Sequence, residues 1–222
     1  MKYPYPLQKI TEELYDPNNC GCICIPHFLE EECTLFLLKE LRTLNYIGQP
    51  ENYGTIRQEI SLSWIKEKNV NNKKEINNKK EINNEKNIIN KKDSYLSKII
   101  EQYTQLHMQI GSYAHFLGEP NNIAILYFQK NSLGMTVHRD ESSFVNLMGL
   151  ITVTGIADFY VCKEKHKVHN NLCEKFDVAS GSLILIRAPR NEEERKLRPY
   201  HCTENITEER YCIGFREERK KR

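Results

Sequence analysis

The sequence lacks long apolar runs and has almost no net charge. No stretch approaches the roughly 18 apolar residues that cross a bilayer, and the N-terminal segment has no apolar core of the secretory type. The formal net charge is +2, so global charge gives no reason to expect nucleic-acid binding and any basic surface must be local. We therefore expect no membrane association, a cytoplasmic or, in a eukaryote, nuclear location, and a monomer.

Cysteine, by contrast, is plentiful, with eight residues in the chain. In an intracellular protein we expect these to be reduced thiols rather than a disulfide framework. Cys20, Cys22 and Cys24 alternate, so in a strand they would share one face. A soft-metal site is one interpretation, but packing is favoured because no fourth ligand is evident and the spacing is not that of a zinc finger.

The 222 residues are enough for one domain with a real core and too few for two large ones. A low-complexity insertion at 68–92 interrupts the chain with the tandem units NNKKEI, NNKKEI and NNEKNI, which offer almost nothing to bury. We interpret 1–222 as a single domain that tolerates a solvated insertion, with contact between its lysines and phosphates as the alternative.

Hydrophobic periodicity indicates a mainly β, α+β protein. Apolar residues at helical spacing predict helices over 28–44 and 94–117. Short apolar segments bounded by turn residues predict strands, at 20–27, 56–65, 123–128, 134–138, 146–154, 157–162, 181–188, 198–202 and 210–216. Strands in this number indicate a sandwich or barrel, with the preceding helices packed on one of its faces.

Three residues form a candidate metal site. His138 and Asp140 are two apart at the end of a predicted strand, so their side chains point to the same side. His201 ends another predicted strand. Two histidines and one carboxylate that leave open positions form the facial triad of non-haem Fe(II) oxygenases, whose open positions accept a chelating co-substrate and O2.

Two arginines strengthen this interpretation. Arg210 lies nine residues after His201 on the last predicted strand, and Arg216 is six residues further, on the same strand face. Cys212 and Gly214 lie between them on that face and are small enough to leave room. A guanidinium near a metal site can hold a carboxylate through two parallel hydrogen bonds, and the distal carboxylate of 2-oxoglutarate would provide one.

Together these segments resemble the AlkB family of 2-oxoglutarate dioxygenases. The resemblance rests on HRD at 138–140, the distal His201 and the Arg-x5-Arg strand RYCIGFR at 210–216, with GSLILIRAP at 181–189 and LGMTVHRDE at 133–141 in the same order. It covers about 20–65 and 94–218. It implies a double-stranded β-helix, or jelly roll, whose mouth holds the iron.

The resemblance also implies roles for individual residues. His138, Asp140 and His201 would bind Fe(II), Arg210 would pair with the far carboxylate of 2-oxoglutarate, and Arg216 would lie near its metal-proximal end. Where the family has Asn-x-Tyr, this chain has Tyr127 and Gln129, which we expect to contact the co-substrate in swapped order. The implied reaction uses Fe(II), 2-oxoglutarate and O2 to demethylate alkylated bases of DNA or RNA, which are read after flipping.

The chain also departs from the family pattern. Many DNA-repair members have a second acidic residue two places after the metal Asp, where this chain has Ser142, with Glu141 beside it. The insertion at 68–92 lies where relatives build their nucleotide-recognition lid. Two alternatives therefore stay open: a hydroxylase or demethylase of a protein or small molecule, and a catalytically silent jelly-roll binding module.

Overall fold

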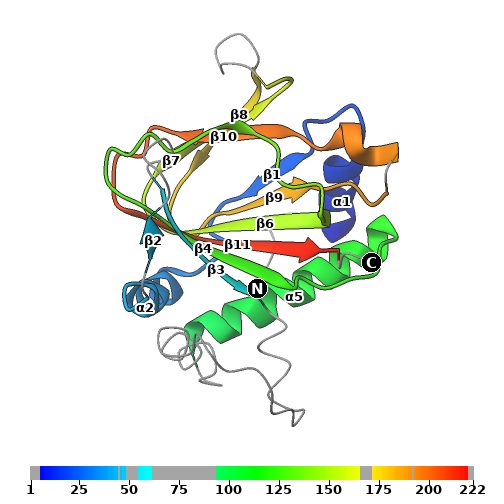
Figure 1. The fold of residues 1–222 in the computed structure, drawn as a ribbon. Helices are drawn as coiled ribbons and strands as arrows, with labels where there is room; N and C mark the ends of the chain where they lie inside the picture. The colour runs from blue at the N-terminus through cyan, green and yellow to red at the C-terminus, as the bar shows by residue number, and fades with distance from the viewer. Residues whose placement is uncertain are drawn as a thin grey trace, which may run out of the picture.

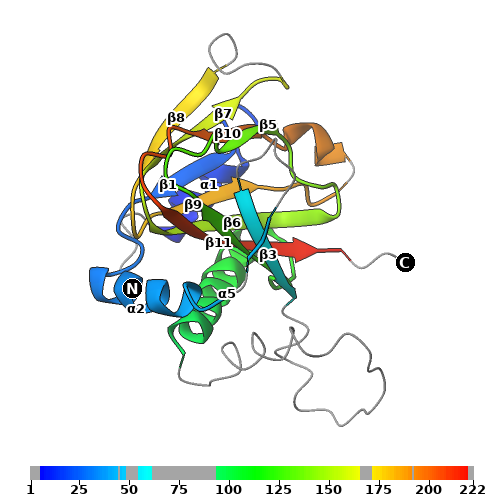
Figure 2. The same ribbon diagram turned by 60° about the vertical axis from the view of Figure 1, so that its left-hand side comes forward.

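Two antiparallel sheets face each other, and helices cover the outer side of the larger one (Figures 1 and 2). The computed structural model describes residues 6–44, 46–48, 55–61, 94–165, 172–191 and 193–219. The larger sheet has the order β1-β9-β6-β11-β4-β3-β2 and the smaller one the order β5-β10-β7-β8. This arrangement of two sheets and flanking helices confirms the predicted jelly-roll class.

The strands of the larger sheet are β1 (Cys22–Ile25), β2 (Ile47–Gly48), β3 (Thr55–Ser61), β4 (Asn122–Phe128), β6 (Phe144–Thr154), β9 (Leu183–Arg187) and β11 (Arg210–Glu218). The smaller sheet consists of β5 (Met135–His138), β7 (Ala157–Cys162), β8 (Leu172–Val178) and β10 (Tyr200–Glu204). The helices are α1 (Leu7–Tyr15), α2 (Glu31–Leu41), α5 (Tyr95–Ala114) and the short 3-10 helix η3 (Glu193–Leu197). None of the described helices is long and apolar enough to cross a membrane.

The longest helix, α5, begins at a well-defined cap. The Ser94 hydroxyl accepts a hydrogen bond from the Ser97 amide at 3.0 Å. The Glu40 carboxylate of α2 accepts from the amides of Tyr95 and Leu96 at 2.9 and 2.8 Å. A carboxylate at free helical N–H groups also opposes the positive end of the helix dipole. Glu40 therefore links the C-terminal part of α2 to the N-terminus of α5.

The main core lies between these helices and the larger sheet, and one glycine sets how closely they approach. Tyr103 of α5 is fully buried, and its ring stacks on Phe215 of β11 with centroids 4.2 Å apart. A Cβ at Gly149 of β6 would collide with the Tyr103 ring. Gly149 thus lets the helix pack directly on the sheet, because no side chain separates the ring from the strand.

The predicted helices and strands match the structure within a few residues, with instructive exceptions. Helix α1 and strand β8 were not expected. In α1, Leu7, Ile10 and Leu14 do recur at helical spacing, but the segment is only nine residues long, and β8 mixes apolar with charged residues. The strand predicted at 198–202 begins at Tyr200 instead, after Pro199, which has no N–H to donate to a ladder. The insertion at 68–92 lies outside the described residues, as do 62–65 of the strand predicted at 56–65.

Candidate metal centre

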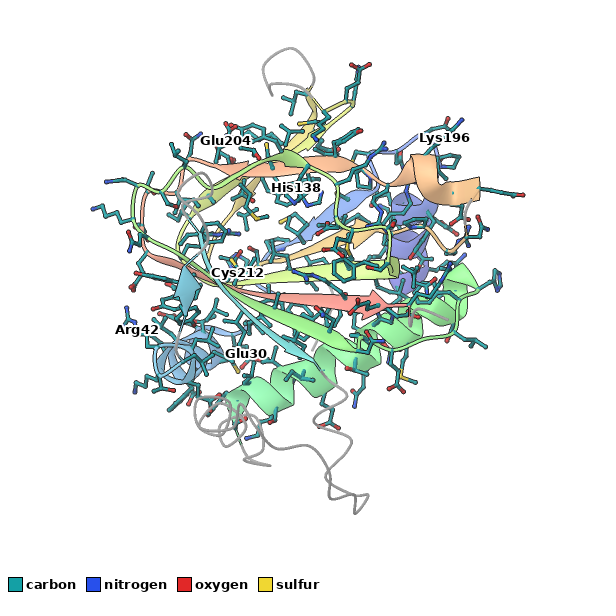
Figure 3. The ribbon with its side chains drawn as sticks, viewed as in Figure 1. Glu30, Arg42, His138, Lys196, Glu204 and Cys212 are labelled. Atoms are coloured by element: carbon teal, nitrogen blue, oxygen red, sulfur yellow. The ribbon has the colours of Figure 1, made fainter. Side chains whose placement is uncertain are left out.

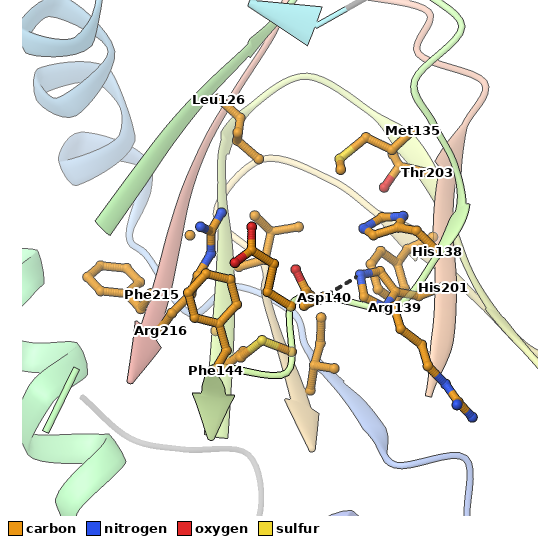
Figure 4. A pocket seen from close by; sticks show the side chains of 17 residues that line it. Leu126, Met135, His138, Arg139, Asp140, Phe144, His201, Thr203, Phe215 and Arg216 are labelled. Carbon is orange, nitrogen blue, oxygen red and sulfur yellow. Dashed lines mark ion pairs between the residues drawn. The ribbon is translucent and has the colours of Figure 1, made fainter. Parts of the chain in front are cut away.

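Strands β5 and β10 bring the three predicted metal ligands to one point between the sheets (Figure 4). His201 lies directly opposite His138 in the antiparallel register, and the two ring centroids are 4.4 Å apart. Asp140 follows just beyond the end of β5, with its Oδ2 3.3 Å from His201 Nε2. One ligand atom from each residue lies within 4.8 Å of the others, and no second such cluster occurs in the described part of the chain.

Neighbouring groups orient both imidazole rings. His138 Nδ1 lies 2.7 Å from the carbonyl oxygen of Thr136, so its N–H donates there and Nε2 faces the other ligands as an acceptor. The Phe159 ring stacks on His201 with centroids 5.4 Å apart. The contact with Thr136 thus fixes the tautomer of His138, and the stack on Phe159 fixes the plane of the His201 ring, which prepares both rings to bind a metal ion.

The electrostatics of the cluster also suit a metal ion. Burial lowers the pKa of His201 to about 4, with Asp140 opposing this shift and His138 adding to it. Burial acts to raise the pKa of Asp140, but His201, His138 and Arg216 outweigh it, so the pKa lies below its usual value. At neutral pH His201 is therefore neutral and Asp140 is ionised, which are the forms that bind metals.

A buried arginine holds the loop that carries Asp140. Arg198 Nη1 donates to the carbonyl oxygens of Asp140 at 3.0 Å and Glu141 at 2.6 Å, and its Nη2 donates to the carbonyl of Phe144. Because Arg198 lies only three residues before His201, it links the loop of one ligand to the strand of another. The sequence interpretation assigned it no role, although RPYH places an arginine beside the distal histidine.

A cavity of about 340 Å³ opens beside the three ligands. Arg216 of β11 enters it from the opposite sheet, with its guanidinium 4.7 Å from the centre of the Phe144 ring (Figure 4). Most of the remaining wall is apolar, formed by Leu126, Met135, Met148, Leu150, Phe159 and Ile186. The cavity thus combines a candidate metal-binding end, the guanidinium of Arg216 and a largely apolar wall.

Arg210 lies on the same face of β11 as Arg216 but is not among the residues that line this cavity, and its charge has no counterion among the described residues. Its side chain is fully buried, and Nη2 donates to Thr152 Oγ1 at 3.0 Å. Nε and Nη1 have no hydrogen-bond partner there. A buried, unneutralised guanidinium is costly unless an anion joins it. The distal carboxylate of 2-oxoglutarate has the required charge and planar geometry, so the residues present fit this co-substrate.

The structure does not bring Tyr127 and Gln129 to the cavity. On β4, Leu126 and Phe128 face the other sheet, so Tyr127 points to the helix-covered side, where its hydroxyl donates to Glu209 Oε1 at 3.1 Å. Gln129 lies beyond the end of β4 and is exposed. The two-residue alternation of the strand accounts for the placement of Tyr127.

The cysteines do not join the metal cluster. Cys202 follows His201 but points to the other face of β10, where it packs with Cys162. Cys20, Cys22 and Cys24 pack against an apolar cluster between the sheets, and they form no metal-ligating group within the described residues. Packing was the favoured expectation for these thiols.

Of the other histidines, His27, His107 and His115 do not line the cavity, and 166–170 lies outside the described residues.

The two-sheet sandwich is similar to the fold of several solved oxygenase structures. A His-x-Asp and a distal His lie together between its layers, and two histidines with one carboxylate are the ligand set used by non-haem Fe(II) oxygenases. No family model matches the sequence, and no curated protein matches it. The likeness is therefore one of structure, at low sequence identity.

Three solved structures illustrate this likeness. A prolyl-4-hydroxylase from Pseudomonas putida superposes with a TM-score of 0.58 at 14% identity, covering 97% of this chain and 100% of its own. HygX from Streptomyces hygroscopicus, with nickel and 2-oxoglutarate bound, gives 0.57 at 13%, covering 94% and 86%. A prolyl hydroxylase from Trichoplax adhaerens, in complex with a hypoxia inducible factor peptide, gives 0.55 at 13%, covering 96% and 90%. At this identity the likeness establishes the fold.

Proposed function

We propose that the chain is an Fe(II)- and 2-oxoglutarate-dependent dioxygenase that oxidatively demethylates alkylated nucleobases in DNA or RNA. The observation that carries the dioxygenase part is the buried, unneutralised guanidinium of Arg210 on the same strand face as Arg216, which lines the cavity of the His138, Asp140 and His201 cluster. A triad of metal-ligating side chains and a buried guanidinium between the same two sheets correspond to the two groups this chemistry requires.

The residues divide the work in a simple way. His138, Asp140 and His201 would hold the iron, which with 2-oxoglutarate supplies O2 activation coupled to the release of CO2 and succinate. Arg210 would neutralise the distal carboxylate of the co-substrate. Arg216, whose positive charge acts on Asp140, would keep that ligand ionised and balance anionic groups at the metal end of the cavity.

The nucleobase part of the proposal rests on the Arg-x5-Arg strand and on the cavity wall. The spacing of Arg210 and Arg216 after the distal histidine is the feature that resembles AlkB-like enzymes. The wall presents Phe144 and Phe159 together with Met135 and Met148. Aromatic and thioether surfaces suit a flat ring that has been flipped out of its stack. Oxidation of its N-methyl group would release formaldehyde and restore the base.

A second candidate keeps the chemistry and changes the substrate to a protein side chain or a small molecule. The net charge of +2 favours it, because nucleic-acid-binding domains are commonly basic. Two of the structures with the same fold are prolyl hydroxylases, and one of these is in complex with a peptide. A proline-containing peptide is therefore a necessary arm of the experiment.

The test measures succinate and formaldehyde from the purified protein with Fe(II), 2-oxoglutarate and ascorbate. Substrates are oligonucleotides with N-methyladenine or N-methylcytosine, the unmethylated oligonucleotide and a proline-containing peptide. His138→Ala removes a ligand. His115→Asn is the matched control, because it removes an exposed histidine at a left-handed position (φ 59°) that asparagine tolerates.

The proposal predicts formaldehyde only with methylated oligonucleotides, lost in His138→Ala and kept in His115→Asn. Succinate that rises with the peptide and without formaldehyde would instead establish the second candidate. Iron binding without any turnover, across all substrates, would point to a silent binding module.

A further inference from the structure

Arg139 stands between two metal ligands in sequence but points away from them. His138 and Asp140 face the cavity, so the alternation of an extended chain turns Arg139 outward to the cavity rim (Figure 4). Its guanidinium lies 3.9 Å from the centroid of the Tyr200 ring. Nη2 also lies 3.4 Å from the carbonyl oxygen of Lys196 on η3, a segment visible at the upper right of Figure 3.

This arginine is held in place without being neutralised. Its partners are a ring and a backbone carbonyl, and no carboxylate pairs with it among the described residues. By contrast, the exposed Arg42 pairs with Glu209 at 2.6 Å, and the half-buried Arg190 pairs with Glu194. Lys196, whose backbone carbonyl contacts Arg139, is itself exposed and adds a second positive charge nearby. A fixed, uncompensated cation at the entrance of a cavity attracts an anionic part of whatever enters.

We propose that Arg139 binds a phosphate of the nucleic-acid backbone next to the base that occupies the cavity. This inference rests on the proposed function and names a contact that positions the substrate. Stacking on Tyr200 uses one face of the guanidinium, and the contact with the Lys196 carbonyl uses one N–H of Nη2, so one two-pronged N–H edge remains available. That edge matches two phosphate oxygens. A base inserted toward the iron leaves its sugar and phosphate at the rim, which is where Arg139 lies.

The proposed phosphate contact predicts how the affinity for the oligonucleotide changes with salt concentration. Each phosphate neutralised on a single strand contributes about 0.7 to the slope of log affinity against log salt concentration. Arg139→Gln should lower that slope by about this amount and weaken binding most at low salt. Arg139→Lys should keep much of the slope, because it keeps the charge but loses the stacked, planar edge.

The experiment measures fluorescence anisotropy of a labelled single-stranded oligonucleotide with one N-methyladenine over a salt series. The variants are Arg139→Gln, Arg139→Lys and the control Lys39→Gln, which removes an equal charge from α2 on the far side of the larger sheet. Urea unfolding and iron content confirm that each variant is folded and loaded. The inference predicts a reduced slope for Arg139→Gln and the wild-type slope for Lys39→Gln.

The outcomes separate the inference from the proposed function. Wild-type binding with an unchanged slope in Arg139→Gln would overturn the inference and leave the demethylase proposal standing. An equal fall in slope for Lys39→Gln would also overturn it, because the effect would then be general charge. A wild-type protein that neither binds nor demethylates the oligonucleotide would overturn the proposed function and this inference with it.

Discussion

The two faces of strand β11 bury different kinds of side chain, although they belong to the same nine residues. Toward the helices, Ile213 and Phe215 are fully buried in the main core, and Phe215 stacks on Tyr103. Toward the smaller sheet, Arg210 and Arg216 are also buried, but Arg210 lacks partners for two of its nitrogens within the described structure. One face is filled with apolar contacts, and the other carries two buried guanidinium groups.

This contrast indicates where stability and function reside. Close packing of apolar groups stabilises the helix side, whereas buried, unneutralised charge on the cavity side costs stability. Proteins tolerate such a cost at sites that bind something. Substitutions on the helix face should therefore change the free energy of unfolding, and substitutions on the cavity face should change binding and turnover.

The largest expected effect is at the metal ligands. Asp140→Ala should lower turnover by more than about 10³-fold, because the residues of such a unit act together and the loss of one disables the others. Succinate release under saturating 2-oxoglutarate measures it, with circular dichroism to show that the fold is intact. Turnover within tenfold of wild type would show that Asp140 is not a ligand.

Arg210→Met sharpens the comparison because its two effects should have opposite signs. Loss of the guanidinium should weaken 2-oxoglutarate binding by about 2–5 kcal/mol, or about 30-fold or more. The free energy of unfolding of the ligand-free protein should stay the same or rise, since an apolar side chain replaces an unpaired buried charge. Calorimetric titration and urea unfolding check the two halves. A large loss of stability with normal co-substrate affinity would contradict the assignment.

Two glycines give a matched test of the faces. Gly149→Ala places a methyl group against the buried Tyr103 ring and should destabilise the protein by about 1–3 kcal/mol through overpacking. Gly214→Ala faces the cavity, where the nearest atom to the new Cβ is the Ala124 carbonyl oxygen at 3.6 Å, an ordinary contact. Its effect on urea unfolding should be within about 0.5 kcal/mol. Equal destabilisation by the two substitutions would contradict the proposed difference between the helix face and the cavity face.

Acid should lower the free energy of unfolding of the metal-free protein through the buried groups of the cavity face. Burial lowers the pKa of His201 to about 4 from 6.5, so between these values the unfolded chain binds more protons than the folded one. The free energy of unfolding should therefore fall as pH falls through this window, by about 2 kcal/mol between pH 7 and pH 5. The lowered pKa of Asp140 acts in the same direction at more acidic pH. Urea unfolding of wild type and His201→Gln measures it, and an equal pH dependence in both would contradict the account.

Much of the site could be predicted because it depends on local geometry. Residues two apart on a strand share a face, which was enough to place His138 with Asp140 and Arg210 with Arg216. The same rule explains Tyr127, whose neighbours Leu126 and Phe128 occupy the inner face of β4. That outcome required knowing which face of β4 is internal, and the nearly continuous apolar sequence IAILYF does not reveal it.

Other features depend on contacts between distant segments. Arg198 supports the loop of Asp140 from more than fifty residues away, and Arg139 rests on Tyr200. Neither contact leaves a periodic signal in the chain, because cross-strand neighbours are set by register rather than by sequence spacing. The jelly-roll class was predictable from the succession of strands, whereas the individual roles of these arginines were not.

Anaerobic titration of the metal-free protein with Fe(II), followed by 2-oxoglutarate, tests the central claim most directly. The account predicts one iron per wild-type chain and tight co-substrate binding to the loaded protein. It predicts no iron in His138→Ala and weakened co-substrate binding in Arg210→Met with the iron retained. Iron that binds His138→Ala as tightly as wild type would contradict the assignment of the metal centre.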